Sequence, residues 1–463
     1  MLKKIEDSTF ICGVLFFATL FLGIIFRVVG LADTSAWGDE VASWYYSQNL
    51  SQVISFESHT PVYYFLCRLW TTVFPETILS LRYFSIVSGL IIILLSSYFV
   101  MKKTGKSLAL LLFATWWLWP TMIIFSRQAR HYGLYADLTL LILVIWGLRV
   151  ELKKWYLWGL LAFYQSLHPL AVIPSFFLFF RDFYVQRNIR KFLFEASSVL
   201  PVSLYYAYRF LIQGQEKVMS NIAWIDNDSS TFLKSLMLLF AGDSYPFSLF
   251  YPVTQTGFFF LLLSLVLIFY VRKSFITNLK KSFPLNFVSI FVVTILFVEL
   301  SAHVVGINFR ISRYFIFLLP FFIFYLTLIA SLWSLKEIQI KTLLVVISLT
   351  TYVVVFQKPW GYYVWDDQIV ESLKGNLREK SESKELVICA SGFQLKYYFN
   401  RPYSNCSEEA FKNYYLNKDF YFFDLNGNDK FLVLSLIEKM KVDEYKRYGH
   451  GVFLSLTQKK DLK

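Results

Sequence analysis

Long apolar runs alternate with short polar and basic stretches from the N-terminus to about residue 357. Most of the runs approach the roughly 20 residues that an α-helix needs to cross the hydrocarbon core of a bilayer. The pattern therefore predicts an α-helical polytopic membrane protein with about 11 transmembrane segments. These are spans near 10–30, 78–101, 106–126 and 133–150, two short helices within 155–181, and spans near 191–212, 252–272, 283–304, 312–334 and 340–357.

The long stretch 155–181 carries His168-Pro169 near its middle and basic clusters at both ends. Proline breaks a helix, and the backbone groups that it frees must be buried in protein or face a water-filled cavity. We therefore predict two short helices that meet at His168-Pro169 and return the chain to the side from which it entered.

Two polar loops and a polar C-terminal part complete the predicted organisation. The loops cover 31–77, with an interfacial helix over 61–74, and 213–251. From residue 358 charges become frequent, and strand-like runs alternate with helix-like ones, so 358–463 reads as a small α/β domain. The predicted strands are Glu385–Ala390, Phe420–Leu425 and Gly451–Leu456, and the predicted helices are Asp366–Lys380 and Phe431–Lys441.

Composition supports the membrane assignment. The chain is 56% hydrophobic, 20% aromatic and only 17% charged, whereas soluble domains are about 25% charged. The net charge of +13 would suggest nucleic acid for a soluble protein. Here the basic residues lie between apolar segments, as the positive-inside bias predicts. We expect a plasma (inner) membrane protein with a retained first helix, a cytoplasmic N-terminus and an extracytoplasmic C-terminal domain.

Two adjacent carboxylates, Asp39 and Glu40, follow the first span. A carboxylate at the membrane–water boundary can take the proton of an acceptor hydroxyl. The alternative is a polar pair that ends a transmembrane helix and meets solvent.

Basic residues recur on the predicted outer face, which otherwise holds few of them. Arg127 and Arg130 join the third and fourth spans, and Arg310 and Arg313 lie in the stretch Asn308–Tyr314, where the span near 312–334 begins. The planar donors of arginine suit a phosphate or diphosphate, although contact with lipid headgroups explains them equally. His59 could bind a phosphate or an acceptor, or it is a loop histidine before Pro61 at the first position of a helix.

Other acidic residues invite less specific interpretations. Asp226-Asn227-Asp228 has the carboxylate spacing of some metal-binding sugar transferases, but a solvated loop explains it as well. Asp137 and Glu299 lie within predicted spans, where acids are expensive. We expect both to be structural partners of nearby basic residues.

Several of these stretches together resemble the GT-C glycosyltransferase superfamily over about residues 1–335. The resemblance is strongest to the bacterial branch of the dolichyl-phosphate-mannose protein mannosyltransferase family, which includes aminoarabinose and lipopolysaccharide-core transferases. It rests on the order of short motifs: Trp37-Gly38-Asp39-Glu40, His59-Thr60-Pro61-Val62-Tyr63-Tyr64, Leu81-Arg82-Tyr83-Phe84-Ser85, Ala129-Arg130-His131-Tyr132, and Arg313-Tyr314 with Pro320.

The resemblance implies an inverting transferase that takes a sugar from a polyprenyl-phosphate donor in the outer leaflet. It implies Asp39 as the base and Glu40 as the residue that orients it or the acceptor. Arg130, Tyr132 and Arg313 would bind the donor phosphate, with His59, Arg127 and Arg310 as further candidates. No metal or other cofactor is expected, although a divalent metal stays open. The sequence departs from the family pattern at Thr60-Pro61, where a doubled proline is common, and the family's phosphate-binding lysines are not evident.

Three other functions compete with this one. An oligosaccharyltransferase would usually need a metal and a larger outer domain. A transporter or flippase for a lipid-linked sugar would be expected to show paired halves, which the sequence does not show. A silent scaffold in a polysaccharide pathway is the third. For the transferase, the acceptor hydroxyl belongs to a cell-envelope glycan, a lipid or a protein.

Overall fold

The computed structural model describes residues 2–32, 38–56, 59–220, 294, 296, 316–330, 335–354, 385–389, 420–424, 440–448 and 451–458. The chain forms two compact units. The first holds Met1–Val29 and Tyr46–Pro359, and the second holds Gly30–Tyr45 and Trp360–Lys463. Gly30–Tyr45, with Asp39 and Glu40, thus belongs to the second unit. The predicted domain border at 357/358 stays a prediction.

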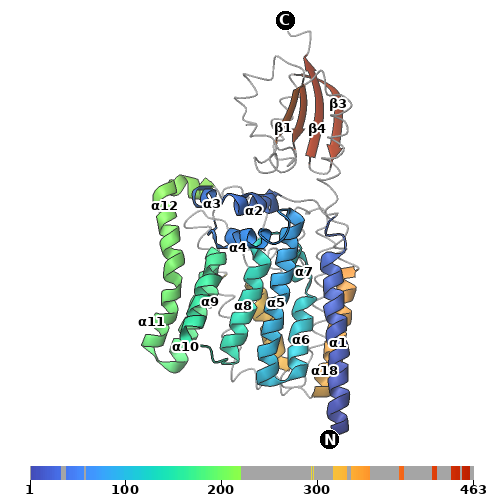
Figure 1. Cartoon of the computed structure of the whole chain (residues 1–463), viewed down its shortest axis with the longest axis vertical. Coiled ribbons are helices and arrows are strands. Elements are labelled where there is room, and N and C mark those ends of the chain that lie inside the picture. Colours follow the sequence, from blue (N-terminus) through green and yellow to red (C-terminus); the bar gives the residue numbers. More distant parts are fainter. Residues whose placement is uncertain are drawn as a thin grey trace. The chain divides into compact units, whose positions relative to one another are not determined.

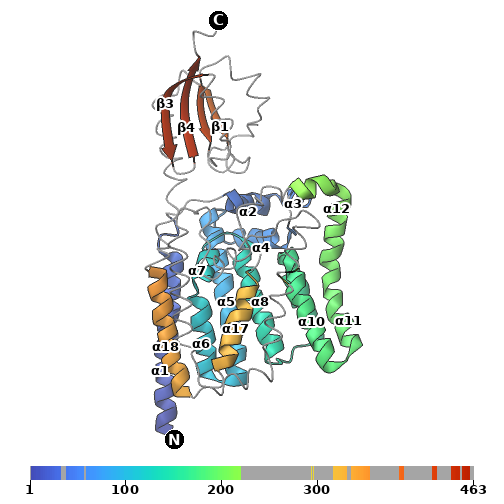
Figure 2. The same cartoon turned by 180° about the vertical axis from the view of Figure 1, so that it is seen from behind.

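The first unit is helical, and its long helices stand side by side while the short α4 lies across their ends (Figures 1 and 2). Its elements, including α2, which crosses into the second unit, are α1 (Leu2–Val28), α2 (Gly38–Gln48), α3 (Leu50–Phe56), α4 (Val62–Thr71), α5 (Ile78–Thr104), α6 (Lys106–Trp117), α7 (Pro120–Ser126), α8 (His131–Gly147), α9 (Lys154–Leu167), η1 (Pro169–Ala171), α10 (Val172–Gln186), α11 (Ile189–Ala196), η2 (Ser197–Val199), α12 (Leu200–Ser220), α17 (Leu318–Ala330) and α18 (Leu335–Tyr352).

The fold confirms the predicted class, an α-helical polytopic membrane protein. Within the described residues, two helices are long and apolar enough to cross a bilayer, Phe10–Val28 and Ile78–Thr104, and the pair α6 and α7 makes a third if it counts as one broken span. The total of about 11 segments stays a prediction, because the span near 252–272, and all of the span near 283–304 except residues 294 and 296, lie outside the described residues.

The predicted span 106–126 is not straight, since α6 and α7 meet at a bend of 62°. Pro120 begins α7 because it has no N–H to continue the preceding helix and suits the first position of a new one. The break frees the carbonyl of Trp117, which accepts a hydrogen bond from the Arg27 side chain at 2.8 Å. The Arg27 guanidinium also lies 3.7 Å from the centroid of the Trp117 ring, so α1 stabilises the bend.

The predicted continuous span 191–212 is wrong, because the chain bends through η2 between α11 and α12. The hydroxyls of Ser197 and Ser198 donate to the carbonyls of Phe194 and Glu195, and such bonds to the preceding turn often bend a helix. The helix α12 also continues to Ser220, into the predicted loop 213–251. By contrast, the break at His168-Pro169 is confirmed: α9 ends at Leu167, and α10 begins at Val172.

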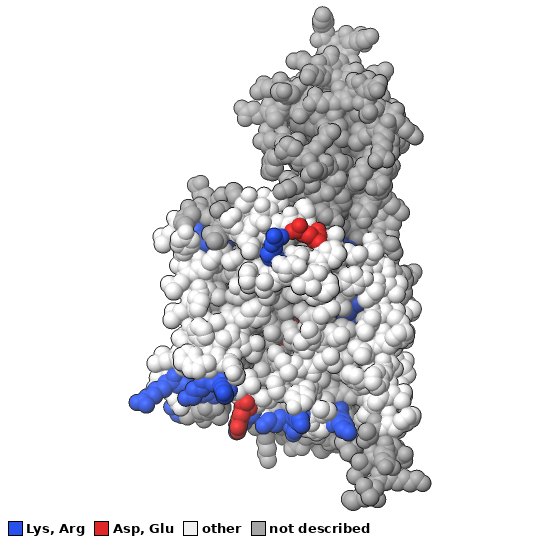
Figure 3. Space-filling view, viewed as in Figure 1, with Lys and Arg blue, Asp and Glu red and all other residues white. Residues whose placement is uncertain are grey.

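Exposed lysines and arginines gather along one rim of the helical unit (Figure 3). They lie in, or at the helix ends beside, the connections that the sequence assigned to one side of the membrane, those between α5 and α6, α8 and α9, and α10 and α11. This distribution supports the same side of the membrane for all these connections. Their cytoplasmic location stays a prediction. The exposed residues are Lys102, Lys103, Lys106, Arg149, Lys153, Lys154, Arg187 and Arg190.

The second unit contains a four-stranded sheet with the order β1-β2-β4-β3, built from β1 (Glu385–Cys389), β2 (Phe420–Asp424), β3 (Met440–Tyr448) and β4 (Gly451–Gln458). The strands β1 and β2 are parallel, and the other pairs are antiparallel. The three predicted strands are confirmed as β1, β2 and β4, whereas β3 was missed. A register shift between Val442 and Glu444 interrupts the alternation by which a strand is recognised in a sequence.

Candidate functional site

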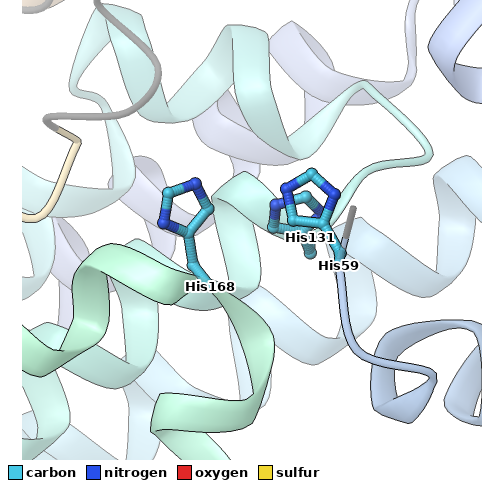
Figure 4. A group of neighbouring side chains, drawn as sticks. All are labelled: His59, His131 and His168. Atoms are coloured by element: carbon cyan, nitrogen blue, oxygen red, sulfur yellow. The ribbon is translucent and has the colours of Figure 1, made fainter. Parts of the chain in front are cut away.

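Three histidines, His59, His131 and His168, form a buried group that we call the histidine cluster (Figure 4). Each offers a ring nitrogen, and these nitrogens all lie within 4.8 Å of one another. The side chains are 8%, 0% and 3% exposed, respectively. The ring centroids are 4.3 Å apart for His59 and His131, and 5.6 Å apart for His131 and His168.

Each member of the cluster stands at the end of a helix. His59 precedes the turn into α4, His131 is the first residue of α8, and His168 follows the last residue of α9. The segments are also joined to one another: the Thr60 hydroxyl donates to the carbonyl of Ser166, and the Tyr205 hydroxyl donates to the carbonyl of His59 at 3.2 Å. These bonds join the segment before α4 to the end of α9 and to the first half of α12.

Tyrosine rings surround the histidine cluster. The Tyr132 ring lies 4.3 Å from that of His131, and the Tyr135 ring stacks on His168 at 5.1 Å with an interplanar angle of 16°. Tyr63 from α4 lies 5.7 Å from His131. The site therefore combines imidazole nitrogens with rigid aromatic walls that limit the access of water.

Arg130 brings a positive charge to this region. It immediately precedes α8, is 4% exposed, and places its guanidinium 5.7 Å from the centroid of the Tyr132 ring. Tyr132 is itself buried. Two of the predicted phosphate-binding residues, Arg130 and Tyr132, thus lie together beside His131, and the cluster adds His59 to them.

Arg127 makes buried hydrogen bonds that the sequence did not indicate. Its Nη1 atom lies 3.0 Å from the carbonyl oxygens of Phe26 and Arg27 and 2.8 Å from that of Val29. These oxygens belong to the last turn of α1 and to the residue that follows it, where no helical N–H remains to satisfy them. Arg127 therefore acts as a side-chain cap that ties the end of α1 to the end of α7.

We expect Arg127→Met to lower the free energy of unfolding by about 1–3 kcal/mol, because buried carbonyls lose their donor. Thermal unfolding of the purified protein in detergent measures the change. The matched control is Arg190→Met, which removes an exposed arginine and should leave stability within about 0.5 kcal/mol. Equal stability of the two variants would contradict the capping role.

Asp39 and Glu40 occupy the first turn of α2. Carboxylates are stabilised there by the positive end of the helix dipole. Glu40 is buried and Asp39 is half-buried, and the Ser43 hydroxyl donates to the backbone carbonyl of Asp39 at 3.1 Å. Arg310, Arg313, Glu299 and Asp226-Asn227-Asp228 lie outside the described residues.

Asp137 within α8 has a partner that the sequence did not indicate. Its carboxylate accepts a hydrogen bond from the Trp116 indole at 2.7 Å and interacts electrostatically with Arg27. A Cβ atom at Gly89 would lie 2.8 Å from the Asp137 carboxylate, so α5 needs glycine there to approach α8. The expected structural role therefore involves an indole as well as a basic residue.

Burial also controls the chemistry of α4, on the flank of the site. It raises the pKa of Cys67 to about 12 and the pKa of Tyr63 well above its ordinary value. Both groups therefore stay protonated at neutral pH, and Cys67 is a poor nucleophile.

A variant that keeps Cys67 as its single cysteine should resist maleimide from pH 7 to pH 9 in the folded state. With a pKa of about 12, roughly one thiol in a thousand is ionised at pH 9, whereas an ordinary thiol is mostly ionised there. The matched control carries Phe65→Cys, an exposed position of α4, as its single cysteine and should label readily. Comparable labelling of the two folded proteins would show that Cys67 is accessible.

Sequence reasoning singled out His59 but not the partnership of His131 and His168. A usable signal was present, since the chain has only five histidines. His168 directly precedes Pro169, and His59 precedes Pro61 by two positions, each at a helix start. His131 follows Arg130 and begins a helix itself.

The fold of this chain has known relatives, whereas its sequence has none among curated proteins and family models. No protein-family model matches the chain, and no curated protein matches its sequence. The fold is nevertheless shared with solved membrane proteins and is the GT-C fold that the motifs predicted. It is similar to ArnT from Cupriavidus metallidurans bound to undecaprenyl phosphate, with a TM-score of 0.59 and 12% identity over 96% of this chain and 97% of that one. For the apo state of that protein the TM-score is 0.51 and the identity is 13%, with the same coverage.

Proposed function

We propose that the protein is an inverting glycosyltransferase that moves a sugar from a polyprenyl-phosphate donor to a hydroxyl acceptor on the outer face of the membrane. The observation that supports this best is the buried group of Arg130, Tyr132 and the histidine cluster, built at helix ends of a GT-C fold. Undecaprenyl phosphate, bound to ArnT in the similar structure, is a polyprenyl phosphate of the kind that would carry the sugar in the proposed donor and leave in the proposed reaction.

In the proposed reaction Asp39 takes the proton from the acceptor hydroxyl. The hydroxyl oxygen then forms a bond to the anomeric carbon of the sugar on the face opposite the phosphate. The bond between that carbon and the phosphate oxygen breaks, and its electron pair leaves with the polyprenyl phosphate. Attack from the opposite face inverts the anomeric configuration, and Glu40 orients Asp39 or the acceptor.

The leaving phosphate gains negative charge as the bond breaks, so donors aimed at it accelerate the step. Arg130 and Tyr132 supply a guanidinium and a phenol for this purpose, and His59 supplies an imidazole. We prefer Arg130 to Arg127 as the phosphate-binding residue because Arg127 already donates to the last carbonyls of α1. Arg313 and Arg310 are assigned to the phosphate on the sequence resemblance alone.

A transfer assay with protein in lipid tests this proposal. It offers a panel of polyprenyl-phosphate sugars with native membrane extract as acceptor, and nucleotide sugars serve as the control donors. The expected result is transfer from one lipid-linked sugar, with inverted configuration in the product, and none from nucleotide sugars. If the protein binds a lipid-linked sugar but transfers none of the sugars in the panel, a flippase or scaffold is favoured.

A further inference from the structure

We propose that the histidine cluster is a binding site for one transition-metal dication of the Zn²⁺ class. Three imidazoles from three separate segments converge with ring nitrogens within 4.8 Å of one another, and all three are buried. Figure 4 shows the rings as one group, with His59 and His131 on one side and His168 on the other. Three ligands with one position left open are the arrangement of a catalytic zinc site.

The donor set selects the kind of metal. Imidazole nitrogens suit zinc, copper, iron and nickel, whereas magnesium and calcium prefer oxygen ligands. The cluster contains nitrogen donors only, so its ligands favour Zn²⁺ over Mg²⁺. This distinguishes it from the Asp226-Asn227-Asp228 stretch, whose carboxylates would suit a harder ion.

Metal binding requires a limited closing of the cluster. Zinc–nitrogen bonds of about 2.0–2.1 Å place tetrahedral ligand atoms about 3.3 Å apart. The ring nitrogens now lie within 4.8 Å of one another. All three side chains lie at helix ends, so side-chain rotation can bring the nitrogens together. His168 Nδ1 accepts the N–H of Leu170 at 3.2 Å. Coordination through Nε2 needs a proton on Nδ1, so metal binding must release this bond in the short turn η1.

A metal at the histidine cluster would also act on the phosphate of the lipid donor. This role of the metal rests on the proposed transferase function. A bound dication polarises a phosphoryl oxygen and stabilises charge on a leaving group. Arg130 carries a positive charge beside the cluster, and this charge favours an anion as the fourth ligand of the metal. We infer that a phosphate oxygen of the lipid donor takes the open position.

Metal content and the visible spectrum of a Co²⁺-substituted protein test the site without any donor. The full chain is purified by a tag without histidine, stripped with a chelator, loaded with Zn²⁺ or Co²⁺ and desalted. We expect one metal per chain and the absorption bands of tetrahedral cobalt. His168→Gln and His131→Gln should each weaken Zn²⁺ binding by more than the roughly 10- to 100-fold loss that follows removal of a ligand's hydrogen-bond partner.

The matched controls are His303→Gln and His450→Gln, which remove the two histidines outside the cluster. Both should retain full metal binding and the cobalt spectrum. A stripped wild-type protein that takes up no zinc while keeping its thermal unfolding temperature would overturn the site. So would cluster variants that bind zinc as tightly as the controls.

The two proposals fail in different ways. One zinc per chain in a protein that transfers no sugar leaves the metal site in place and counts against the transferase. Full transfer by a metal-free protein supports the transferase and overturns the metal's role at the donor phosphate, whereas only the uptake measurements decide the metal site itself.

Discussion

Replacement of Asp39 by Asn is expected to lower the turnover rate by about 10²- to 10⁴-fold, the range that a positioned general base contributes. Asparagine keeps the size of the side chain but cannot take a proton from the acceptor hydroxyl. The loss should therefore fall on turnover at saturating donor, with donor binding little changed. Initial rates of transfer in lipid, measured against donor concentration, separate these two effects.

The control for this experiment is Glu151→Gln, which neutralises an exposed acid in the connection between α8 and α9. Its turnover should equal that of the wild type. Expression and thermal unfolding of Asp39→Asn should also be normal, because Asp39 is half-buried in the first turn of a short helix. Near-normal turnover in Asp39→Asn would remove the base assignment.

Arg130→Ala is expected to raise the apparent KM for the donor roughly 10- to 150-fold, which corresponds to the loss of about 1.5–3 kcal/mol for a hydrogen bond to a charged group. The effect should be large because Arg130 is buried beside Tyr132 and His131, where water does not replace the lost donor. Arg130→Lys should recover part of the affinity, since it restores the charge but not the planar pair of donors.

Arg68→Ala is the matched control for Arg130→Ala. Arg68 is exposed on α4 and forms an ion pair with Glu76 at 2.8 Å. Exposed pairs of this kind contribute about 0–1 kcal/mol, so neither the donor dependence nor the stability should change much. An unchanged donor KM in Arg130→Ala, at normal stability, would move the phosphate site to other residues.

Features that depend on neighbouring residues in the chain could be predicted from the sequence. The apolar helix α5, the break at His168-Pro169 and the strands β1, β2 and β4 follow from hydrophobic periodicity and from proline chemistry. The predictions failed where a contact from elsewhere or an irregularity intervened. The hydroxyls of Ser197 and Ser198 interrupt an apolar run that reads as one span, and a register shift hides β3.

In the candidate site, too, local features could be predicted from the sequence and long-range contacts could not. The motif containing Arg130 and Tyr132 is local, and the structure places the two residues together, as their adjacency required. The role of Arg127 could not be predicted in this way, since it depends on carbonyls about 100 residues earlier in the chain. An arginine in a polar loop looks the same whether it meets a phosphate or a helix end.

The sequence by itself determined the membrane class, the GT-C resemblance and the proposed carboxylate base, because composition, periodicity and short motifs are properties of consecutive residues. Only the tertiary structure decided that His59, His131 and His168 share one buried site and that Arg127 caps α1. The physical reason is that helix packing fixes which helix ends meet. That packing is determined by contacts between segments far apart in the chain, which the pattern along any one segment does not specify.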